Sequence, residues 1–348
     1  MKKLEFLKMN QKMAVSFEFP IPPWYKKLFY ETCLMYFHSC SQENRIPHAG
    51  LSIEIQDILK GFFIHQKSSV SFFKTKETKT ELAPDYSFDE SKIAVAFSGG
   101  KDCVYLVHKL IESGYKPENI LNLYIPSLNK SESYYEKIAV EKISKKFGCQ
   151  FHIIPTVNSI KLNRTGHNIG VREQLIAGLC LPYMIQFGAS KIYFGLKKEV
   201  SNSHLYSDDP KVFKLYQDRI NKDVPQIELV PYSLLKGTTD LDIAKVMARE
   251  MRDILDITSS CYTQLNFREK RHETLKQRFK EIPIYNGCGS CQKCMIINAA
   301  IVLEMVEVIK DSTKKRFLNF YEKRMEEKFM DNTDITTAHK EMKSLWKM

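Results

Sequence analysis

The sequence predicts an α/β fold built on a parallel β-sheet. Short apolar runs at residues 93–97, 120–125, 150–154 and 191–196 have the length and composition of buried strands. Segments with helical spacing of apolar residues separate these runs. Strands that alternate with helices form a parallel sheet covered on both faces. A fifth strand is expected at residues 227–230, just before a proline.

The composition is that of an ordinary globular protein. The chain has 348 residues, of which 43% are hydrophobic and 27% charged, enough for one large core or two modest domains. No stretch reaches the roughly 18 apolar residues of a membrane span, and charge interrupts residues 1–8 too early for a signal peptide. Nine cysteines, several in Cys-x-x-Cys spacing, favour metal binding in a reducing compartment. We therefore expect a cytoplasmic protein that does not bind membranes.

The first 90 residues predict a small α+β appendage. Residues 14–19 and 69–73 have the pattern of strands, and residues 24–37 that of a helix. Residues 75–89 mix charged residues with a proline and predict a linker or surface loop. The appendage either packs on the core or docks a partner. Residues 1–90 form the first predicted domain.

Two further regions follow this appendage. Residues 91–257 predict the sheet domain, with amphipathic helices at 131–147 and 171–187. Residues 258–348 predict a helical region that carries clustered cysteines. Its tail contains a helical stripe of Phe317, Tyr321 and Met325, which favours internal packing or the seam of a homodimer over a ligand site.

A glycine turn between the first buried strand and a helix predicts a site for pyrophosphate. The turn reads Ser98-Gly99-Gly100-Lys101-Asp102-Cys103. Two glycines let an oxyanion approach the main chain, and the helix that follows offers unpaired N–H groups with partial positive charge. The plainer interpretation is an ordinary Gly-Gly turn.

The motif resembles the PP-loop of the ATP pyrophosphatases, which reads Ser-Gly-Gly-x-Asp-Ser. It has neither the G-x-x-x-x-G-K-S/T nor the G-x-G-x-x-G spacing, and Cys103 stands where that family usually has serine. The resemblance implies a Rossmann-like sheet with ATP at the carboxyl ends of its strands. The expected ATP-binding residues are Ser98, Gly99, Gly100, Lys101, Asp102, Cys103, Tyr124, Ile125 and Gly195.

A second site is predicted from the cysteine spacing. Cys288, Cys291 and Cys294 lie within seven residues, and Cys261 is the best fourth candidate. Four thiolates make a closed tetrahedral zinc site. An iron–sulfur cluster is the competing interpretation, although no Cys-Pro follows the last cysteine, and free thiols are a third. The remaining apolar cysteines, expected to be packed core thiols, are Cys33, Cys40, Cys149 and Cys180.

Together the two sites resemble 7-cyano-7-deazaguanine (preQ0) synthase, over roughly residues 91–300. The family has a late Ser-Cys-Tyr, as at residues 260–262, before a Cys-Gly-x-Cys-x-x-Cys, as at residues 288–294. Its Tyr-Pro-Asp-Cys-Arg-x-x-Phe segment is similar to residues 206–213. Its proline-then-lysine segment resembles residues 231–236, and its Arg-Asn resembles Arg172-Glu173.

The resemblance implies an ATP-dependent ligase that adenylates the carboxylate of 7-carboxy-7-deazaguanine and then forms an amide or nitrile with ammonia. AMP supplies the leaving group, while the loop and Mg²⁺ absorb charge on pyrophosphate; Zn²⁺ is the implied structural metal. The residues implied to act in catalysis or electrostatic stabilisation are Lys101, Asp102, Arg172 and Lys236. Those implied to contact the substrate are Tyr206 and Asp208.

Several departures from the family indicate a divergent member with an extra N-terminal region. Glu173 replaces the family's asparagine, Asp209-Pro210 replaces its Cys-Arg pair, and Met295 follows the last cysteine where arginine is common. A basic helical insert at residues 266–285 separates the first cysteine from the other three.

These departures leave three alternatives open. In the first alternative, the activated acid is transferred to a protein amine, as in relatives from antiviral operons that conjugate a deazaguanine to protein. In the second, the chain is a PP-loop enzyme that modifies tRNA. In the third, it is a non-catalytic nucleotide-binding scaffold that works through its N-terminal region. A net charge of +11 suits an anionic ligand, but the absence of a long basic run disfavours nucleic acid.

Overall fold

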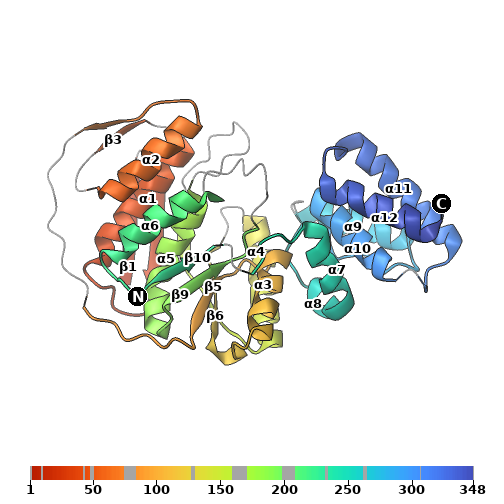
Figure 1. Cartoon of the computed structure of the whole chain (residues 1–348), viewed down its shortest axis with the longest axis horizontal. Coiled ribbons are helices and arrows are strands. Elements are labelled where there is room, and N and C mark those ends of the chain that lie inside the picture. Colours follow the sequence, from red (N-terminus) through yellow and green to blue (C-terminus); the bar gives the residue numbers. More distant parts are fainter. Residues whose placement is uncertain are drawn as a thin grey trace. The chain divides into compact units, whose positions relative to one another are not determined.

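The structure, a computed structural model, divides the described chain into two compact units (Figure 1). It describes residues 2–8, 11–41, 44–47, 51–73, 84–126, 130–158, 171–197, 208–231, 234–261, 265–305 and 307–347. The first unit comprises Met1–Phe97, Ile111–Leu128 and Gly148–Lys236, and the second comprises Ser98–Leu110, Asn129–Phe147 and Gly237–Met348. The three-domain division expected from the sequence stays a prediction.

A parallel five-stranded sheet forms the centre of the first unit. Its strands are β5 (Ile93–Ala96), β6 (Ile120–Tyr124), β7 (Gln150–Ile153), β9 (Lys191–Phe194) and β10 (Glu228–Val230). They lie in the order β10-β9-β5-β6-β7, and all neighbours are parallel. The chain adds β6 and β7 on one side of β5, then β9 and β10 on the other. This is the strand order of a Rossmann-like sheet, so the predicted α/β fold class and all five predicted strands are confirmed.

The helices of the first unit pack in two layers, an inner one on the sheet and an outer one on the inner helices. They are α1 (Tyr25–Ser41), α2 (Ile53–His65), α5 (Arg172–Phe187) and α6 (Pro210–Asn221), with a short 3₁₀ helix η1 (Pro117–Asn119) before β6. Helix α5 packs on β5, β6 and β9, and α6 packs on β10. Helix α1 packs on α5, and α2 packs on α6 and α1. One hydrophobic core therefore joins the N-terminal helices to the sheet.

Helix α1 repairs a defect in α5. Pro182 lies inside α5 and has no N–H, so it cannot donate to the carbonyl of Gly178 four residues earlier. The hydroxyl of Tyr25, on α1, donates to that carbonyl at 2.7 Å. Tyr25 is fully buried, and burial raises the pKa of its phenol well above the usual value. The proline in α5 is therefore tolerated because α1 supplies the missing donor.

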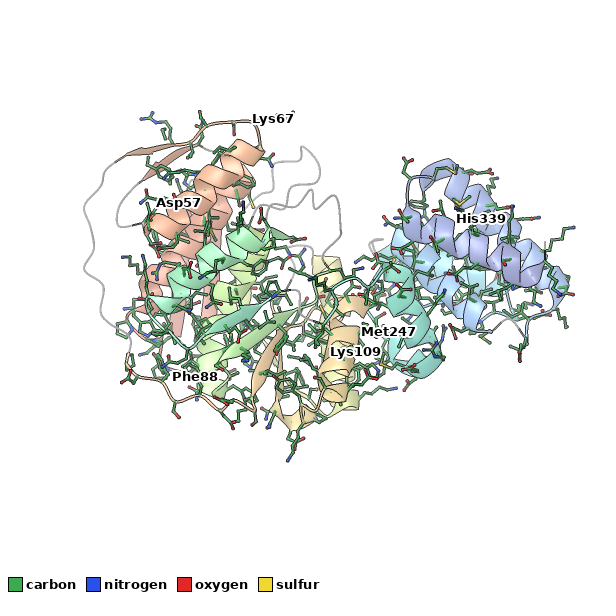
Figure 2. The ribbon with its side chains drawn as sticks, in the orientation of Figure 1. Asp57, Lys67, Phe88, Lys109, Met247 and His339 are labelled. Carbon is green, nitrogen blue, oxygen red and sulfur yellow. The ribbon has the colours of Figure 1, made fainter. Side chains whose placement is uncertain are left out.

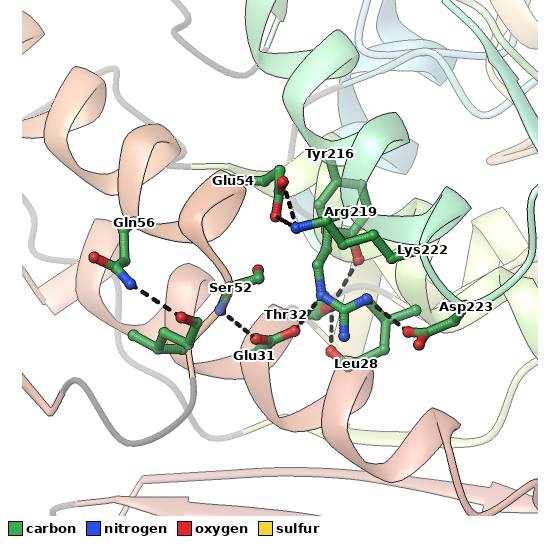
Figure 3. A network of polar contacts seen from close by, with 11 residues as sticks. Leu28, Glu31, Thr32, Ser52, Glu54, Gln56, Tyr216, Arg219, Lys222 and Asp223 are labelled. Atoms are coloured by element: carbon green, nitrogen blue, oxygen red, sulfur yellow. Dashed lines mark hydrogen bonds and ion pairs between the residues drawn. The ribbon is translucent and has the colours of Figure 1, made fainter. Parts of the chain in front are cut away.

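A buried ionic network joins α1, α2 and α6 (Figure 3). The Arg219 guanidinium on α6 pairs with Glu31 on α1 and with Asp223 at 2.6 Å. Burial lowers the pKa of Arg219, but the two carboxylates outweigh it and the net shift is upward. Glu31 also accepts from the amide of Ser52, at the start of α2, at 2.7 Å. Buried charges need such partners, so the network fixes how the three helices meet.

The N-terminal strands pair with one another and with a strand from the middle of the chain. Strands β1 (Lys2–Lys8), β2 (Gln11–Phe17) and β8 (Thr156–Asn158) form an antiparallel sheet in that order. Strands β3 (Arg45–Pro47) and β4 (Ser71–Phe73) pair in parallel. Of the predicted linker at residues 75–89, residues 75–83 lie outside the described residues, and residues 84–89 have no regular structure.

The second unit is helical. Its helices are α3 (Lys101–Glu112, whose last two residues belong to the first unit), α4 (Lys130–Phe147), α7 (Asp240–Glu250), α8 (Arg252–Leu255), α9 (Leu265–Arg278), α10 (Gln292–Glu304), α11 (Asp311–Lys328) and α12 (Thr333–Trp346). Helix α10 packs on α7 and α12, and α11 packs on α12. His339 of α12, labelled in Figure 2, lies 2.8 Å from Glu322 of α11. Within the described ranges, no helix is long and apolar enough to cross a bilayer.

The aromatic stripe of the C-terminal tail is buried inside this unit. Phe317, Tyr321 and Met325 of α11 are each less than a tenth exposed. Phe317 meets the ring of Phe279 edge to face, and the Tyr321 hydroxyl donates to the carbonyl of Ile335 on α12. The stripe therefore serves internal packing, the first of the two predicted roles.

Candidate functional site: a glycine loop tied to four cysteines

The glycine loop that follows β5 has the geometry of an anion cradle. Gly99 has a φ of +73°, a conformation that favours glycine. A Cβ at Gly99 would also lie only 2.8 Å from the Cβ of Ala139. Within the described part of the chain, the amides of Gly99 and Gly100 have no hydrogen-bond acceptor. Two N–H groups at the start of α3 are therefore available to an anion.

Another amide of the loop already has a partner. The Lys101 N–H donates to the Ser260 hydroxyl at 2.9 Å, and the Ser259 N–H donates to the Gly99 carbonyl at 2.8 Å. The Ser98 hydroxyl and the Cys103 thiol lie 3.6 Å apart at the same turn. An anion would thus meet the Gly99 and Gly100 amides rather than that of Lys101.

Lys101 is an internal cation of the second unit. Its side chain is fully buried, and its ammonium lies 2.5 Å from Asp102 and also pairs with Asp240. Burial lowers the pKa of this ammonium, but the two carboxylates outweigh it and raise the pKa. Because both neighbours are anionic, the charge of Lys101 is largely neutralised within the protein. Its expected role in stabilising phosphate stays a prediction.

Sequence reasoning missed Asp240. This residue begins α7, where Thr239 and Asp242 form a reciprocal capping box that fixes the start of the helix. The capping box places the Asp240 carboxylate at the N-terminal end of α7. The Thr-x-x-Asp pattern at residues 239–242 was the one signal in the sequence, and it predicts a helix start rather than a partner for Lys101.

The four predicted metal-binding cysteines lie together. The sulfur atoms of Cys261, Cys288, Cys291 and Cys294 are all within 4.8 Å of one another, and those of Cys288 and Cys294 are 4.0 Å apart. Tetrahedral zinc with bonds near 2.3 Å places its sulfur ligands about 3.8 Å apart. The donor set and its spacing therefore fit one metal ion.

Main-chain amides support the sulfurs. The Cys288 N–H donates to the Cys261 sulfur at 3.3 Å, and the Cys291 N–H donates to the Cys288 sulfur at 3.3 Å. The pKa of Cys261 is lowered to about 6, because the hydrogen bond with Cys288, which raises it, is outweighed by those with Cys291 and Cys294. The pKa values of Cys291 and Cys294 are raised. The cluster thus already favours one thiolate.

The basic helix α9 is anchored on the cysteine loop. Gly289 has a φ of +65°, and a Cβ there would lie 1.8 Å from a methyl group of Leu275 on α9. Arg271 of α9 donates to the Ser290 hydroxyl at 3.1 Å, and Arg268 donates to the Asn286 carbonyl. The predicted basic insert at residues 266–285 is therefore helical as far as Arg278, and this helix packs on the cysteine loop.

Three of the expected ATP-binding residues belong to the first unit. Tyr124 is the last residue of β6, Ile125 follows it, and Gly195 follows β9. Strands β6 and β9 flank β5, so these residues come at the carboxyl ends of adjacent parallel strands. Ligands of such sheets bind at this edge, where the strand order reverses. Their contact with ATP stays a prediction.

The residues implied by the family resemblance are more scattered. The Arg172 side chain is about half exposed, at 49%, and its Nε lies 3.8 Å from the carboxylate of Glu173. Lys236 is exposed, and Asp208 is half-buried beside the helix cap Asp209. Tyr206 lies outside the described residues. Their roles in catalysis and substrate binding stay predictions.

The other apolar cysteines are buried, as predicted. Cys33, Cys40, Cys149 and Cys180 are each less than a tenth exposed. Burial raises the pKa of all four, to about 12 for Cys40 and Cys149. Their thiols are therefore packed and protonated.

Comparisons with known proteins find similarity only at the level of solved structures. No family model and no curated protein matches the chain. The U34-tRNA thiolase NcsA from Methanococcus maripaludis, solved with its 4Fe–4S cluster, shares 16% identity over 66% of this chain and 76% of its own, with a TM-score of 0.32. The NH3-dependent NAD synthetase from Campylobacter jejuni shares 13% sequence identity, over 47% of this chain and 76% of its own, with a TM-score of 0.23. At these scores neither likeness decides the fold, which rests on the strand order.

Proposed function

We propose that the chain is an ATP-dependent enzyme that transfers the adenylyl group of ATP to a carboxylate. The observation that carries the proposal is the pair of amides at Gly99 and Gly100, which precede α3 where the strand order of the sheet reverses. Amides at a helix N-terminus bind phosphate oxygens and stabilise the charge of departing pyrophosphate. Mg²⁺ prefers oxygen ligands, and Asp102 is the carboxylate of the loop that would hold it with the phosphates.

The substrate proposed for this site is 7-carboxy-7-deazaguanine. A carboxylate is a poor electrophile until one oxygen is bonded to a good leaving group, and AMP provides one. Ammonia would then attack the acyl carbon and release AMP, which leaves an amide. A second ATP would adenylate the amide oxygen with release of pyrophosphate, and departure of AMP with that oxygen, together with loss of a proton from nitrogen, would give a nitrile. The family resemblance of the two motifs supports this choice.

Zinc is the metal proposed for the four cysteines. Sulfur separations of no more than 4.8 Å suit a single ion, because an iron–sulfur cluster places iron and sulfide atoms between its cysteine sulfurs. We expect about one zinc per chain by elemental analysis, and a clear loss in Cys291→Ser. Iron with visible absorbance would overturn the assignment.

Adenylation is tested by incubating the protein with ATP, Mg²⁺, ammonia and the acid. The expected products are AMP and an amide or nitrile of lower mass. Gly100→Ala adds a methyl group 3.4 Å from the Ser98 hydroxyl, a distance the fold tolerates. The variant keeps the Gly100 N–H, but its methyl group crowds the turn that would hold the phosphate oxygens. It should therefore lower AMP release by about tenfold or more, with an unchanged unfolding temperature. Release of ADP would count against the proposal, and an adduct on an added protein amine would redirect it to conjugation.

A second candidate, modification of tRNA, is favoured by the position of α9. Its basic side chains lie beside the cysteines, where Arg271 contacts Ser290. Nucleic acid bound through such residues weakens steeply with added salt. If AMP appears only when tRNA is present, and binding falls with salt, this candidate replaces the first. ATP binding with no turnover under any condition would favour a scaffold.

A further inference from the structure

One short segment connects the cysteine cluster to the glycine loop. Ser259 donates its N–H to the Gly99 carbonyl at 2.8 Å, and Ser260 accepts from the Lys101 N–H at 2.9 Å. The next residue is Cys261, whose sulfur belongs to the cluster. Three consecutive residues thus contact both sites, and Ser260 is only 4% exposed. The two hydrogen bonds hold the loop at the Gly99 carbonyl and the Lys101 amide, which lie on either side of Gly100.

A buried tyrosine braces this segment from the other side. The Tyr285 hydroxyl donates to the Thr258 carbonyl at 2.7 Å and accepts from the Ser260 N–H at 3.1 Å. The Tyr285 N–H donates to the Asn298 side chain at 2.8 Å. Asn298 lies on α10, the helix that also carries Cys294. The segment is therefore held by the loop, by Tyr285 and by its own cysteine.

We propose that metal bound to the four cysteines controls the conformation of the glycine loop, and that Ser260 is the positioning residue that transmits this control. Metal–sulfur bonds fix Cys261 and hence the direction of the two preceding residues. Without the metal, the segment is held by hydrogen bonds alone, and a larger fraction of molecules has the loop detached from Ser259 and Ser260. The effect on nucleotide affinity, but not the effect on the loop, rests on the proposed function.

The coupling is reciprocal. If metal raises the affinity of the loop for nucleotide by some factor, nucleotide must raise the affinity of the cysteines for metal by the same factor. The two affinities are measured separately, so their agreement is a check on the proposal that needs no turnover.

Hydrogen–deuterium exchange of residues 98–104 tests the link without nucleotide. In the full-length chain, removal of metal with a chelator should speed exchange in this segment by about five- to tenfold, the effect of losing a buried hydrogen bond. Ser260→Ala should cause a similar increase while zinc content stays at the wild-type value, and removal of metal should then add little. Ser260→Thr keeps the hydroxyl and should restore slow exchange.

A matched control is Thr313→Val, which also removes one buried hydroxyl, here donated to Glu281 at 2.7 Å. It should leave exchange of residues 98–104 unchanged. Equal exchange in the metal-loaded and metal-depleted wild-type chain would overturn the proposal, whatever the variants do. A full response to metal in Ser260→Ala would refute Ser260 as the positioning residue.

Titration with a non-hydrolysable ATP analogue then separates the two proposals. After the chelator is removed and Mg²⁺ added, the analogue should bind several-fold more weakly to the metal-depleted chain and to Ser260→Ala. If exchange responds to metal but no analogue binds to any form, the coupling stands and the adenylation proposal fails. If the analogue binds with the same affinity to all forms and exchange does not respond to metal, the coupling proposal fails while the adenylation proposal stands.

Discussion

Lys101 has a fully buried ammonium that faces two carboxylates, those of Asp102 and Asp240. Removing one partner from a buried ion pair leaves uncompensated charge and costs about 3–5 kcal/mol. Lys101→Met should therefore lower the free energy of unfolding by about that amount. Urea denaturation measures it.

The matched comparison uses Asp240→Asn and the double variant. With one carboxylate neutralised, loss of the ammonium costs less, so the double variant should be more stable than the sum of the single effects predicts. Additive effects would mean that the two side chains do not interact.

His152 gives the first unit a dependence on pH. Burial lowers the pKa of its imidazole, and Glu18 only partly opposes this. The unfolded chain therefore binds a proton near its ordinary pKa of about 6.5 while the folded chain does not. Stability conferred by the neutral ring is fully present above about pH 6.5 and is lost as the pH falls toward the lower folded value.

His152→Phe keeps an aromatic ring beside Tyr183, whose centroid lies 4.5 Å from that of His152. Between pH 7 and pH 5.5, the unfolding free energy of the variant should fall less than that of the wild type. Identical slopes in denaturation series at several pH values would contradict the assignment.

The residues of the site divide into those that local sequence identifies and those it cannot. The glycines of the loop and the Cys-x-x-Cys residues are recognisable because their local spacing is typical of an anion-binding turn and of a metal site. The contacts made by Asp240, Ser260 and Tyr285 are not recognisable, because each joins residues that are distant in the sequence. Lys101 is 139 positions from Asp240 and 159 from Ser260. Only the folded unit shows that these partners meet.

At the scale of elements, the buried strands were predictable because a short apolar run bounded by turns has few other solutions. The same reasoning missed β8, a stretch of three residues that becomes a strand only because β2 pairs with it. It also missed β1, whose alternating charged residues gave no clear apolar run. Short edge strands depend on tertiary partners more than on their own sequence.

The contact between α1 and α5 can be tested through the repaired carbonyl of Gly178. Tyr25→Phe leaves this buried acceptor without a donor and should cost about 1–3 kcal/mol. In a Pro182→Ala background, the N–H of residue 182 can donate to the same carbonyl, so Tyr25→Phe should cost less there. Thermal and urea unfolding of the four chains measure the difference. An equal cost in both backgrounds would exclude the proposed repair.

At the scale of the whole molecule, both candidate sites draw on residues of the second unit. The glycine loop, its buried lysine and all four cysteines belong to the second unit, whereas the sheet and the N-terminal helices belong to the first. The sequence separates residues 1–90 from the sheet by composition alone, since the predicted surface loop at residues 75–89 lies at the end of this region. It could not reveal that α1 and α2 pack on α5 and α6, because an apolar helix face does not indicate which other element will cover it.

Deletion of residues 1–73 tests this arrangement. Trp24, Leu28 and Phe37 of the N-terminal region lie in one hydrophobic core with the helices on the sheet. Their removal would expose the outer faces of α5 and α6, including the buried Arg219 that pairs with Glu31. We expect the remaining chain to aggregate or to unfold at a markedly lower temperature, in light scattering and calorimetry. A soluble fragment with the wild-type unfolding temperature would instead identify residues 1–73 as an independent appendage, because a shared core cannot lose one side without losing the free energy of its burial.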